Sequence, residues 1–516
     1  MIQRWGLSKT MVEPLTDTVL SRLSSLVSEK LGLHFPEKRW PDLERGIAAA
    51  ARDLGLANAT ECALWLASTS FSRSQAETLA ANLTVGETYF FREKRSFEVL
   101  ENEVLPELIR LRQNTNMRLR VWSAGCCSGE EPYSVAILLS RLLPNISDWN
   151  ITILATDINP RALKRAVEGE YGEWSFRDTP DWIRRRYFTK TAAGKWKISD
   201  EIKKLVTFSY LNLVEDVYPS IINQTNAMDV VFCRNVLMYF VPELLQKVAE
   251  RLYRTIYKNG WLLVGPSETS QTLFAHFVPT YFPGVIFYRK ESKRQPDSQA
   301  PSAHVERWVP CAGIEPSILP VSVLPEGDTT LPDSFTIPEV ADLPKKMIRN
   351  IQEAESLYRA GGWQDAEKIA RELAEDKPLQ PAVSALLSRI CADAGRLKEA
   401  LIWSDRAVDS ARLNPVYRYL RAMVQDELGD SAAAVTSFEQ ALYLDDTLVV
   451  AHFALANLQR RLEMQKRSAV HFRVALSLLN AYTPEELLPE SEGLTAGRLI
   501  EIIRAATAGT QPGQGS

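Results

Sequence analysis

The sequence predicts a protein of three parts: an all-α domain, a central α/β domain and a C-terminal solenoid of helical repeats. Two observations support this prediction. Between residues 118 and 290, short β-rich runs alternate with helical patterns, which is typical of an α/β sheet with right-handed crossovers. After residue 343, small residues recur at a step of 34 residues, which is typical of stacked helix pairs. A chain of 516 residues is also too long for one hydrophobic core.

The N-terminal stretch predicts a helical domain over residues 12–85. Apolar residues recur at spacings of three and four, as on one face of a helix, in the runs LSSLVSEKLGL, PDLERGIAAAARDLGL and SQAETLAANL. These runs carry no strand signal. Shortly after them come Phe90 and Phe91, which we expect to dock the helical domain on the sheet.

Six β-rich runs predict the strands of the central domain, which we place at residues 86–290. They are RLRVWSAG, ITILATD, VTFSYLNL, DVVFCRN, GWLLVGPS and VIFYRK. Several are apolar on both faces, as buried parallel strands must be. Helical patterns such as EEPYSVAILLSRLL lie between them, so we expect a Rossmann-like alternation of strand and helix.

Residues at a fixed step predict tetratricopeptide (TPR) repeats over residues 344–480. Four series keep the 34-residue step: Gly361, Gly395 and Gly429; Ala366, Ala400 and Ala434; Ala407, Ala441 and Ala475; and Phe438 and Phe472. A fourth unit has Glu463 and Ser468 in place of the glycine and alanine. A generic helical bundle with alanine-rich seams is the alternative. Residues 291–343 are rich in Pro and Ser and predict a linker, and residues 481–516, with ELLPESEG and LTAGRLIEIIRAA, predict a helical cap and tail.

The composition excludes several classes of protein. Apolar residues make up 45% of the chain, charged residues 24%, and the net charge is −4, so no basic footprint for nucleic acid is present, although a local basic face remains open. No apolar run is long enough to span a membrane, and the N-terminus lacks the apolar segment of a signal peptide. The six cysteines show no metal-ligand spacing, which predicts reduced thiols in a cytoplasmic protein without a metal.

The loop SAGCCSGEEPYS follows the first predicted strand, where α/β sheets bind ligands. Gly125 and Gly129 permit tight turns and close approach of a ligand to the backbone. Neither GxGxxG nor GK[ST] is present, so a phosphate site is not indicated. Glu130 and Glu131 would repel a phosphate. They suit a ligand that offers hydroxyl groups or a positive charge.

The second strand ends at Asp157, where an acid can accept hydrogen bonds from both hydroxyls of a ribose. Together with the first loop, this predicts a nucleoside without phosphate that carries a cation, and S-adenosylmethionine fits that description. The alternative is that Asp157 only caps the helix beginning at Pro160. Weaker signals come from Asn235 and Tyr239, which would share a face if a helix began there, and from Arg92, which could pair with a ligand carboxylate.

The blocks GETYFFRE, SAGCCSGEEPYS, ATDIN, LNL and FCRNVLMYF, in this order and spacing, resemble the chemoreceptor glutamate methyltransferases of the CheR family. The resemblance covers about residues 15–290, and the tail is similar to the subset of CheR proteins that carry TPR repeats. It implies an S-adenosylmethionine-dependent methyltransferase sheet with a small antiparallel β-subdomain inserted at about 171–206, its hairpin turn near TAAGK. In some members this subdomain binds a tethering peptide at the receptor C-terminus.

The resemblance also implies a set of site residues. Those expected to contact the methyl donor are Gly86, Thr88, Arg92, Glu131, Asp157, Asn212, Leu213, Arg234 and Asn235. Tyr239 would orient the substrate glutamate, and Arg92 would anchor the donor. Two positions depart from the family: Gly86 stands where many members have Asn, and Cys127 where they have Ser or Ala, which would make the loop sensitive to oxidation.

The implied reaction is methylation of glutamates in the cytoplasmic helical domain of a chemoreceptor, with S-adenosylhomocysteine as the product. A basic face at Lys38, Arg39, Arg45 and Arg52 would meet this acidic substrate. The repeats could dock the receptor, dock another signalling protein, or fold back over the active site; docking of a partner on a flexible tether is favoured. We expect recruitment to receptor arrays, without nucleic acid or membrane insertion. The alternatives are a non-catalytic sensor of the donor or its product, and a methyltransferase for a small molecule or RNA.

Overall fold

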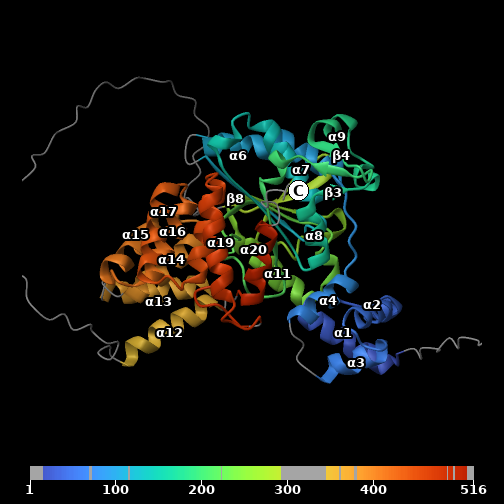
Figure 1. Ribbon diagram of the computed structural model, residues 1–516, viewed down its shortest axis with the longest axis horizontal. Helices are drawn as coiled ribbons and strands as arrows, with labels where there is room; N and C mark the ends of the chain where they lie inside the picture. The colour runs from blue at the N-terminus through green and yellow to red at the C-terminus, as the bar shows by residue number, and fades with distance from the viewer. Residues whose placement is uncertain are drawn as a thin grey trace, which may run out of the picture.

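The computed structural model describes residues 15–68, 73–113, 117–221, 223–291, 345–359, 362–376, 381–484, 486–491 and 494–507. The N-terminal helices lie at one end of the molecule, the sheet lies in the middle and the helical repeats lie on the other side (Figure 1). Beyond Glu291, the linker predicted at 291–343 lies outside the described residues. None of the helices described is long and apolar enough to cross a membrane.

Four helices form the N-terminal unit: α1 (Asp17–Leu31), α2 (Trp40–Asp53), α3 (Ala59–Ser68) and α4 (Arg73–Leu83), with a short 3-10 turn η1 (Glu37–Arg39) before α2. Their apolar faces enclose one core, in which Val27, Leu43 and Ile47 are fully buried. The chain leaves α1 through Gly32, whose φ of 75° continues no helix and turns the chain toward the sheet.

The central sheet has seven strands in the order β6-β2-β1-β7-β8-β10-β9. Their bounds are β1 (Arg118–Ala124), β2 (Asn150–Asp157), β6 (Val206–Tyr210), β7 (Met228–Cys233), β8 (Ile256–Val264), β9 (Val278–Phe282) and β10 (Val285–Arg289). The first five in this order are parallel, whereas β10 runs antiparallel to both of its neighbours. The sequence predicted neither β9 nor the direction of β10. Two antiparallel strands at the edge of a sheet are joined by a short turn, so no helical pattern between them marks their direction.

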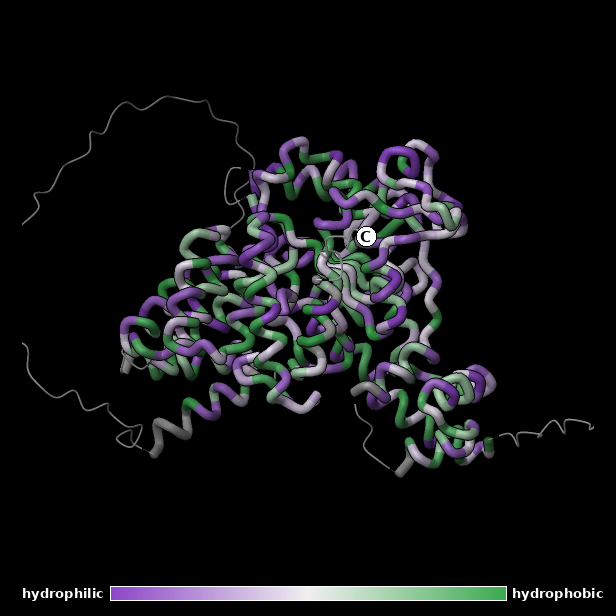
Figure 2. Tube along the Cα trace, viewed as in Figure 1, coloured by the Kyte–Doolittle hydropathy of each residue, from purple (hydrophilic) through white to green (hydrophobic). Residues whose placement is uncertain are grey.

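Helices cover both faces of this sheet, so two cores form. The covering helices are α5 (Lys94–Val99), a π-helical turn η2 (Leu100–Val104), α6 (Leu105–Gln113), α7 (Glu130–Leu142), α8 (Pro160–Glu168) and α11 (Pro242–Thr255). Within β1, Val121 packs into one core and Trp122 into the other, which explains why this strand is apolar at successive positions. Hydrophobic residues follow the central strands in Figure 2, while the outer helices alternate between hydrophobic and hydrophilic stretches.

A small antiparallel sheet, in the order β3-β5-β4, is inserted between β2 and β6. It consists of β3 (Glu170–Tyr171), β4 (Phe188–Lys190) and β5 (Trp196–Ile198), with η4 (Glu173–Phe176), α9 (Asp181–Tyr187) and α10 (Asp200–Lys203). The hairpin between β4 and β5 closes with Thr191 N–H donating to the Lys195 carbonyl at 2.7 Å. Phe90 was expected to dock the helical domain. It packs instead into this subdomain, with its ring 4.9 Å from Tyr171 and 4.9 Å from Phe188, because aromatic neighbours surround it there.

The C-terminal part is a solenoid of helix pairs, as the 34-residue step predicted. The pairs are α12 (Lys345–Arg359) with α13 (Trp363–Asp376), α14 (Pro381–Asp393) with α15 (Leu397–Ser410), α16 (Pro415–Glu427) with α17 (Ser431–Leu444), and α18 (Val449–Arg461) with α19 (Gln465–Leu479). Ala400, Ala434 and Ser468 are buried at the same register between paired helices. One helix, α20 (Ala496–Thr507), covers the end. The described part of ELLPESEG is not helical; Leu487 pairs with Thr495 in an antiparallel bridge.

The turns between paired helices need a left-handed residue. Gly395 and Gly429 have φ of 75° and 85°, and Glu463 occupies the same register with φ of 59°. Gly361 lies outside the described residues. The fourth unit therefore keeps the turn of its neighbours although a side chain at this φ is unfavourable.

Replacing Glu463 by Gly should raise the free energy of unfolding of the repeats by about 0.5–1 kcal/mol, because it removes the left-handed penalty and costs some chain entropy. Denaturant unfolding followed by circular dichroism would measure this. Glu463→Ala is the matched control, since it removes the same charge but keeps a Cβ. Equal stabilisation by both variants would show that charge, not backbone conformation, is responsible.

Candidate functional site

A cavity of about 1000 Å³, counting the open space at its mouth, lies at the carboxyl ends of β1, β2, β6 and β7. We call it the strand-tip cavity. All ten residues that the sequence analysis proposed for the site line it: Gly86, Thr88, Arg92, Glu131, Asp157, Asn212, Leu213, Arg234, Asn235 and Tyr239. They come from segments up to 153 positions apart (Gly86 to Tyr239). Parallel strands that end at one edge bring them together.

The loop after β1 depends on its glycines for protein packing. Gly125 has φ of 86°, and a Cβ there would lie 2.3 Å from Cγ2 of Val236 in the loop after β7. Gly129 has φ of 92°, and a Cβ there would lie 2.9 Å from the Ala166 side chain of α8. Both positions therefore require glycine, because a side chain would push this loop away from the loop after β7 or from α8.

The two adjacent glutamates of this loop face different surroundings. Glu131 lines the cavity; its Oε1 accepts from the Ser123 hydroxyl at 2.7 Å, and its Oε2 lies 3.1 Å from Arg234. Glu130 turns away into a buried position, where it accepts from the hydroxyls of Ser128 and Ser175. Burial raises the pKa of Glu131, while the Arg234 guanidinium acts in the opposite direction. Of these two adjacent glutamates, Glu131 is the one that lines the cavity.

Asp157 ends β2 and is held by the backbone. Its Oδ2 accepts from the Cys127 N–H and its Oδ1 from the Asn159 N–H, both at 2.8 Å. Burial raises the pKa of Asp157, although these backbone N–H groups lower it. The alternative role as a helix cap is wrong: Asn159 caps α8, its side chain accepting from the Arg161 and Ala162 N–H groups. Asp157 is left to face the cavity.

Arg234 lines the cavity and is held there by several partners. Its side chain is 2% exposed and forms ion pairs with Glu93 at 2.8 Å and Glu131 at 3.1 Å. It also donates to the Arg92 carbonyl at 2.7 Å, so it fixes the segment that carries Arg92. The Arg92 guanidinium donates to the Glu87 carbonyl at 2.6 Å and lines the cavity.

The helix expected to begin near Asn235 does not form. Asn235 has φ of 58°, a short 3-10 turn η5 (Leu237–Tyr239) follows, and α11 begins only at Pro242. The turn is held by Glu268, a buried acid that the sequence analysis missed. Its carboxylate accepts from the N–H groups of Asn235 at 2.6 Å and Gly265 at 2.8 Å. Asn235 and Tyr239 still line one cavity, but through this turn instead of a helix face.

The N-terminal unit supplies a wall that the sequence analysis also missed. Leu31 and Leu33, at the end of α1, line the cavity together with Leu213. The contact is fixed by Asn212, which is 2% exposed and donates from its side chain to the Lys30 carbonyl at 3.0 Å. Asn212 thus joins the helical unit to the sheet, and no local pattern around Leu31 could have indicated this.

The two departures from the expected family pattern lie in contact. A Cβ at Gly86 would lie 3.1 Å from the Sγ of Cys127, so the smaller residue makes room for the larger one. Burial raises the pKa of Cys127 to about 11, which keeps its thiol neutral. The expectation that Cys127 makes the loop sensitive to oxidation is therefore not supported, since the thiolate is the reactive form.

Comparison with known proteins places this architecture in a family. A family model described as "CheR methyltransferase, SAM binding domain" matches residues 86–280. A "Chemotaxis protein methyltransferase" of Borreliella burgdorferi is 33% identical over 257 residues, which are 49% of this chain and 89% of that protein. "Chemotaxis protein methyltransferase 1" of Pseudomonas aeruginosa is 36% identical over 42% of this chain and 77% of its own length.

A solved structure, "MamA 41-end from Desulfovibrio magneticus RS-1", is similar to 26% of this chain and 76% of its own, with 19% identity and a TM-score of 0.25. A likeness this weak carries no argument. The assignment of the repeats depends on the 34-residue spacing in the sequence and on the helix pairs in the structure. The matched regions cover 89% of the Borreliella burgdorferi protein and 77% of the Pseudomonas aeruginosa protein. The chain therefore belongs to the CheR family of S-adenosylmethionine-dependent chemotaxis methyltransferases.

Proposed function

We propose that this protein methylates glutamate side chains of a chemoreceptor, forming glutamate methyl esters and S-adenosylhomocysteine. The observation that carries the proposal is the strand-tip cavity itself, in which two carboxylates, Glu131 and Asp157, replace the phosphate-binding groups of a nucleotide site. The chemistry of the cavity fits a sulfonium nucleoside, because it combines acids with the apolar walls of Leu31 and Leu213.

Each residue has a role consistent with its contacts. Asp157 is positioned to accept hydrogen bonds from the ribose hydroxyls, since its oxygens face the cavity and its backbone partners hold it in place. Glu131, held by Ser123 and Arg234, adds negative charge that tolerates the cation. Arg92 lies at the same wall and would pair with the donor carboxylate. Leu31 and Leu213 would cover the base.

Methyl transfer forms a bond from a glutamate oxygen to the methyl carbon and breaks the bond from that carbon to sulfur. A carboxylate is already a nucleophile at neutral pH, so the chain needs to position it and exclude water. Positioning of this kind can supply about 7–11 kcal/mol of the barrier. Tyr239, partly exposed at the cavity wall, is placed to donate a hydrogen bond that orients the glutamate.

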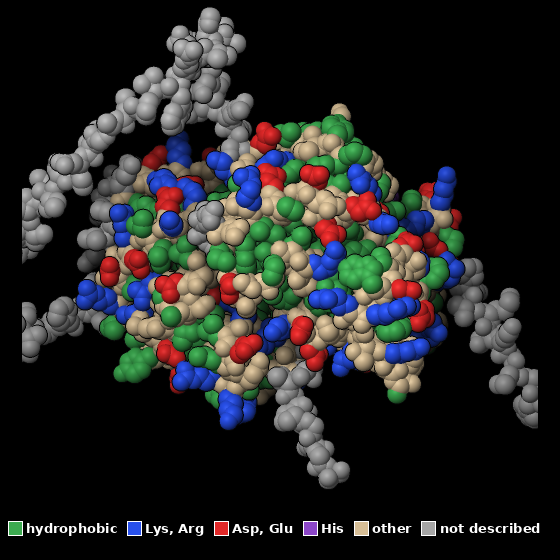
Figure 3. Space-filling view, turned by 90° about the horizontal axis from the view of Figure 1, so that it is seen from above, with side chains coloured by type: hydrophobic (Ala, Val, Ile, Leu, Met, Phe, Trp, Pro, Cys, Tyr) green, Lys and Arg blue, Asp and Glu red, His purple; other side chains and the backbone are tan. Residues whose placement is uncertain are grey.

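The predicted basic face, Lys38, Arg39, Arg45 and Arg52, divides in the structure. The guanidinium of Arg39 lies 6.0 Å from the Tyr239 ring and 5.0 Å from the Phe35 ring, so it reaches the reacting end of the cavity. Arg45 and Arg39 both form ion pairs with Asp42, so the position beside Tyr239 is what distinguishes Arg39. On the face drawn in Figure 3, Lys and Arg side chains lie among Asp and Glu rather than in one large patch. We therefore assign the substrate contact first to Arg39.

The test of this function is methyl transfer from radiolabelled S-adenosylmethionine to receptor-enriched membranes of the source organism. Base-labile label is expected with the wild type. Asp157→Asn should abolish it and weaken donor binding by about 10- to 150-fold, the loss of charged hydrogen bonds worth about 1.5–3 kcal/mol. Asp53→Asn, an exposed aspartate paired with Arg161, is the control. Donor binding without any label would favour the sensor hypothesis.

Replacing Tyr239 by Phe should lower kcat by up to about tenfold, the value of one hydrogen bond of about 0.5–1.5 kcal/mol, and leave the Kd for the donor unchanged. Steady-state methylation and calorimetry separate the two effects. Tyr281→Phe, at a position 64% exposed in β9, is the matched control. If kcat stays at the wild-type value, Tyr239 does not orient the glutamate.

Gly86→Asn alone should weaken donor binding, because the new Cβ crowds the Cys127 sulfur. Cys127→Ser in the same chain should restore it by removing the larger atom. Calorimetric titration with S-adenosylhomocysteine over the two single variants and the double variant measures the coupling between the positions. Additive effects of the two substitutions would show that the contact does not shape the cavity.

A further inference from the structure

The repeats dock along the edge of the sheet where the parallel strands begin, opposite the strand-tip cavity. A Cβ at Gly395 would lie 2.5 Å from the ring of Tyr257 in β8, and Glu427 pairs with Arg118 and Arg120 of β1. Glu463 lies 3.8 Å from Lys204, just before β6. Successive repeat turns therefore follow the strand order from β8 to β6. None of the described repeat residues lines the strand-tip cavity, and the described repeats contact the sheet directly.

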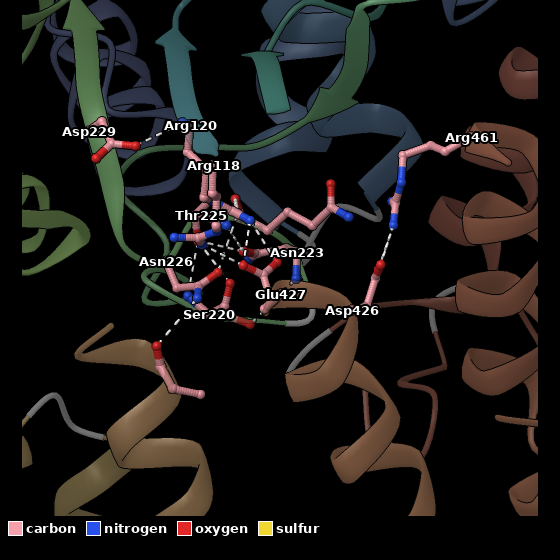
Figure 4. Close-up of polar contacts among 12 residues, drawn as sticks. Arg118, Arg120, Ser220, Asn223, Thr225, Asn226, Asp229, Asp426, Glu427 and Arg461 are labelled. Atoms are coloured by element: carbon pink, nitrogen blue, oxygen red, sulfur yellow. Dashed lines mark hydrogen bonds and ion pairs between the residues drawn. The ribbon is translucent and has the colours of Figure 1, made fainter. Parts of the chain in front are cut away.

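Glu427 is the charged centre of this interface (Figure 4). Its carboxylate is 6% exposed and lies 2.5 Å from Nη2 of Arg118 and 2.6 Å from Nη1 of Arg120, whose side chains are 5% and 2% exposed. Burial works against its charge, but Arg120 and Arg118 hold the pKa of Glu427 below its usual value. Removing one partner of such a buried pair leaves an uncompensated charge, so the contact cannot be cut without consequence.

A loop between β6 and β7, which we call the bridging loop (described residues 214–221 and 223–227), is held in the same interface. Ile221 is 1% exposed and packs in the core of the repeats. Asn226 donates to the Ala392 carbonyl of α14 at 3.3 Å and accepts from Arg120 at 3.3 Å. Arg120 also donates to the Gln224 carbonyl. Contacts with the repeats and with Arg120 thus hold the part of this loop that lies farthest from the strand-tip cavity, at Ile221, Gln224 and Asn226.

The near end of the bridging loop supports the wall of the strand-tip cavity. Ser220 and Thr225 close the loop on itself, with the Thr225 N–H donating to the Ser220 carbonyl at 3.0 Å. From there Tyr218, 3% exposed, donates its hydroxyl to the Leu213 carbonyl at 2.8 Å. Leu213 lines the cavity. One short hydrogen-bonded segment therefore touches the repeats at one end and the proposed donor site at the other.

We propose that Glu427 is a positioning residue for donor binding: by pairing with Arg118 and Arg120, it holds the repeats on the bridging loop and so fixes the wall at Leu213. This inference rests on the proposed donor site. The repeats are then a part of the donor site's support, and not only a docking arm. Loss of the pair should release the loop and lower affinity for the donor without changing the reacting groups.

The test uses the full chain. Glu427→Ala should raise the Kd for S-adenosylhomocysteine by about fivefold or more, and raise KM for the donor while kcat at saturating donor stays unchanged. Glu427→Gln keeps one oxygen that can accept from the arginines but removes the charge that pairs with them, so its Kd should lie between those of the wild type and Glu427→Ala. The matched control is Asp426→Ala: Asp426 pairs with Arg461 inside the solenoid at 2.6 Å and should leave the Kd unchanged.

A second variant guards against misfolding. Asn226→Ala cuts the loop from Ala392 and Arg120 without leaving a charge unpaired, and should shift the Kd in the same direction by a smaller factor. Hydrogen exchange over the bridging loop reports whether it has been released. Release of the loop with an unchanged Kd would overturn the inference, whereas a wild-type chain that binds no S-adenosylhomocysteine would overturn the proposed function instead.

Discussion

Buried arginines form ion pairs at both ends of the parallel strands, and the rest of the molecule is arranged around them. At the carboxyl edge, Arg234 is enclosed by Glu93 and Glu131, so the loops that carry the site residues cannot separate without exposing an unpaired charge. At the opposite edge, Arg120 meets Glu427 from the repeats. Ion pairs this deeply buried add specificity of arrangement more than net stability, since desolvation offsets much of their attraction.

Much of the site could be predicted because parallel strands end together. Once β1, β2, β6 and β7 are placed, a polar residue at the end of each strand faces one side of the sheet, and Asp157 follows from that rule. Asn235 was only a weak signal by itself, and the family resemblance added it to the site. Contacts between distant segments left no such trace. Leu31 belongs to an ordinary amphipathic helix, and Glu268 looks like any acid in a loop, although each shapes the cavity. Glu427 could not be told from a solvated helix residue, because its partners lie 307 and 309 positions away.

Neighbouring residues of the same type can have separate tasks. Glu130 and Glu131 are adjacent at the start of α7, yet the helix turns them about a hundred degrees apart, one into the junction with the small sheet and the other into the cavity. In the same way, Gly86 and Cys127 look like two independent losses when each is compared with a family pattern. In the structure the two positions face each other, so the smaller residue at 86 leaves space for the larger residue at 127.

The register between repeats and strands limits how this chain can be lengthened. An isolated solenoid tolerates an added or deleted unit, because each unit contacts only its neighbours. Here the turns at Gly395, Glu427 and Glu463 meet β8, β1 and the start of β6 in order. Inserting one 34-residue unit before α16 would move Glu427 away from Arg118 and Arg120, and these arginines would then face a different repeat turn. The width of the sheet thus sets how many repeats this enzyme can carry alongside it.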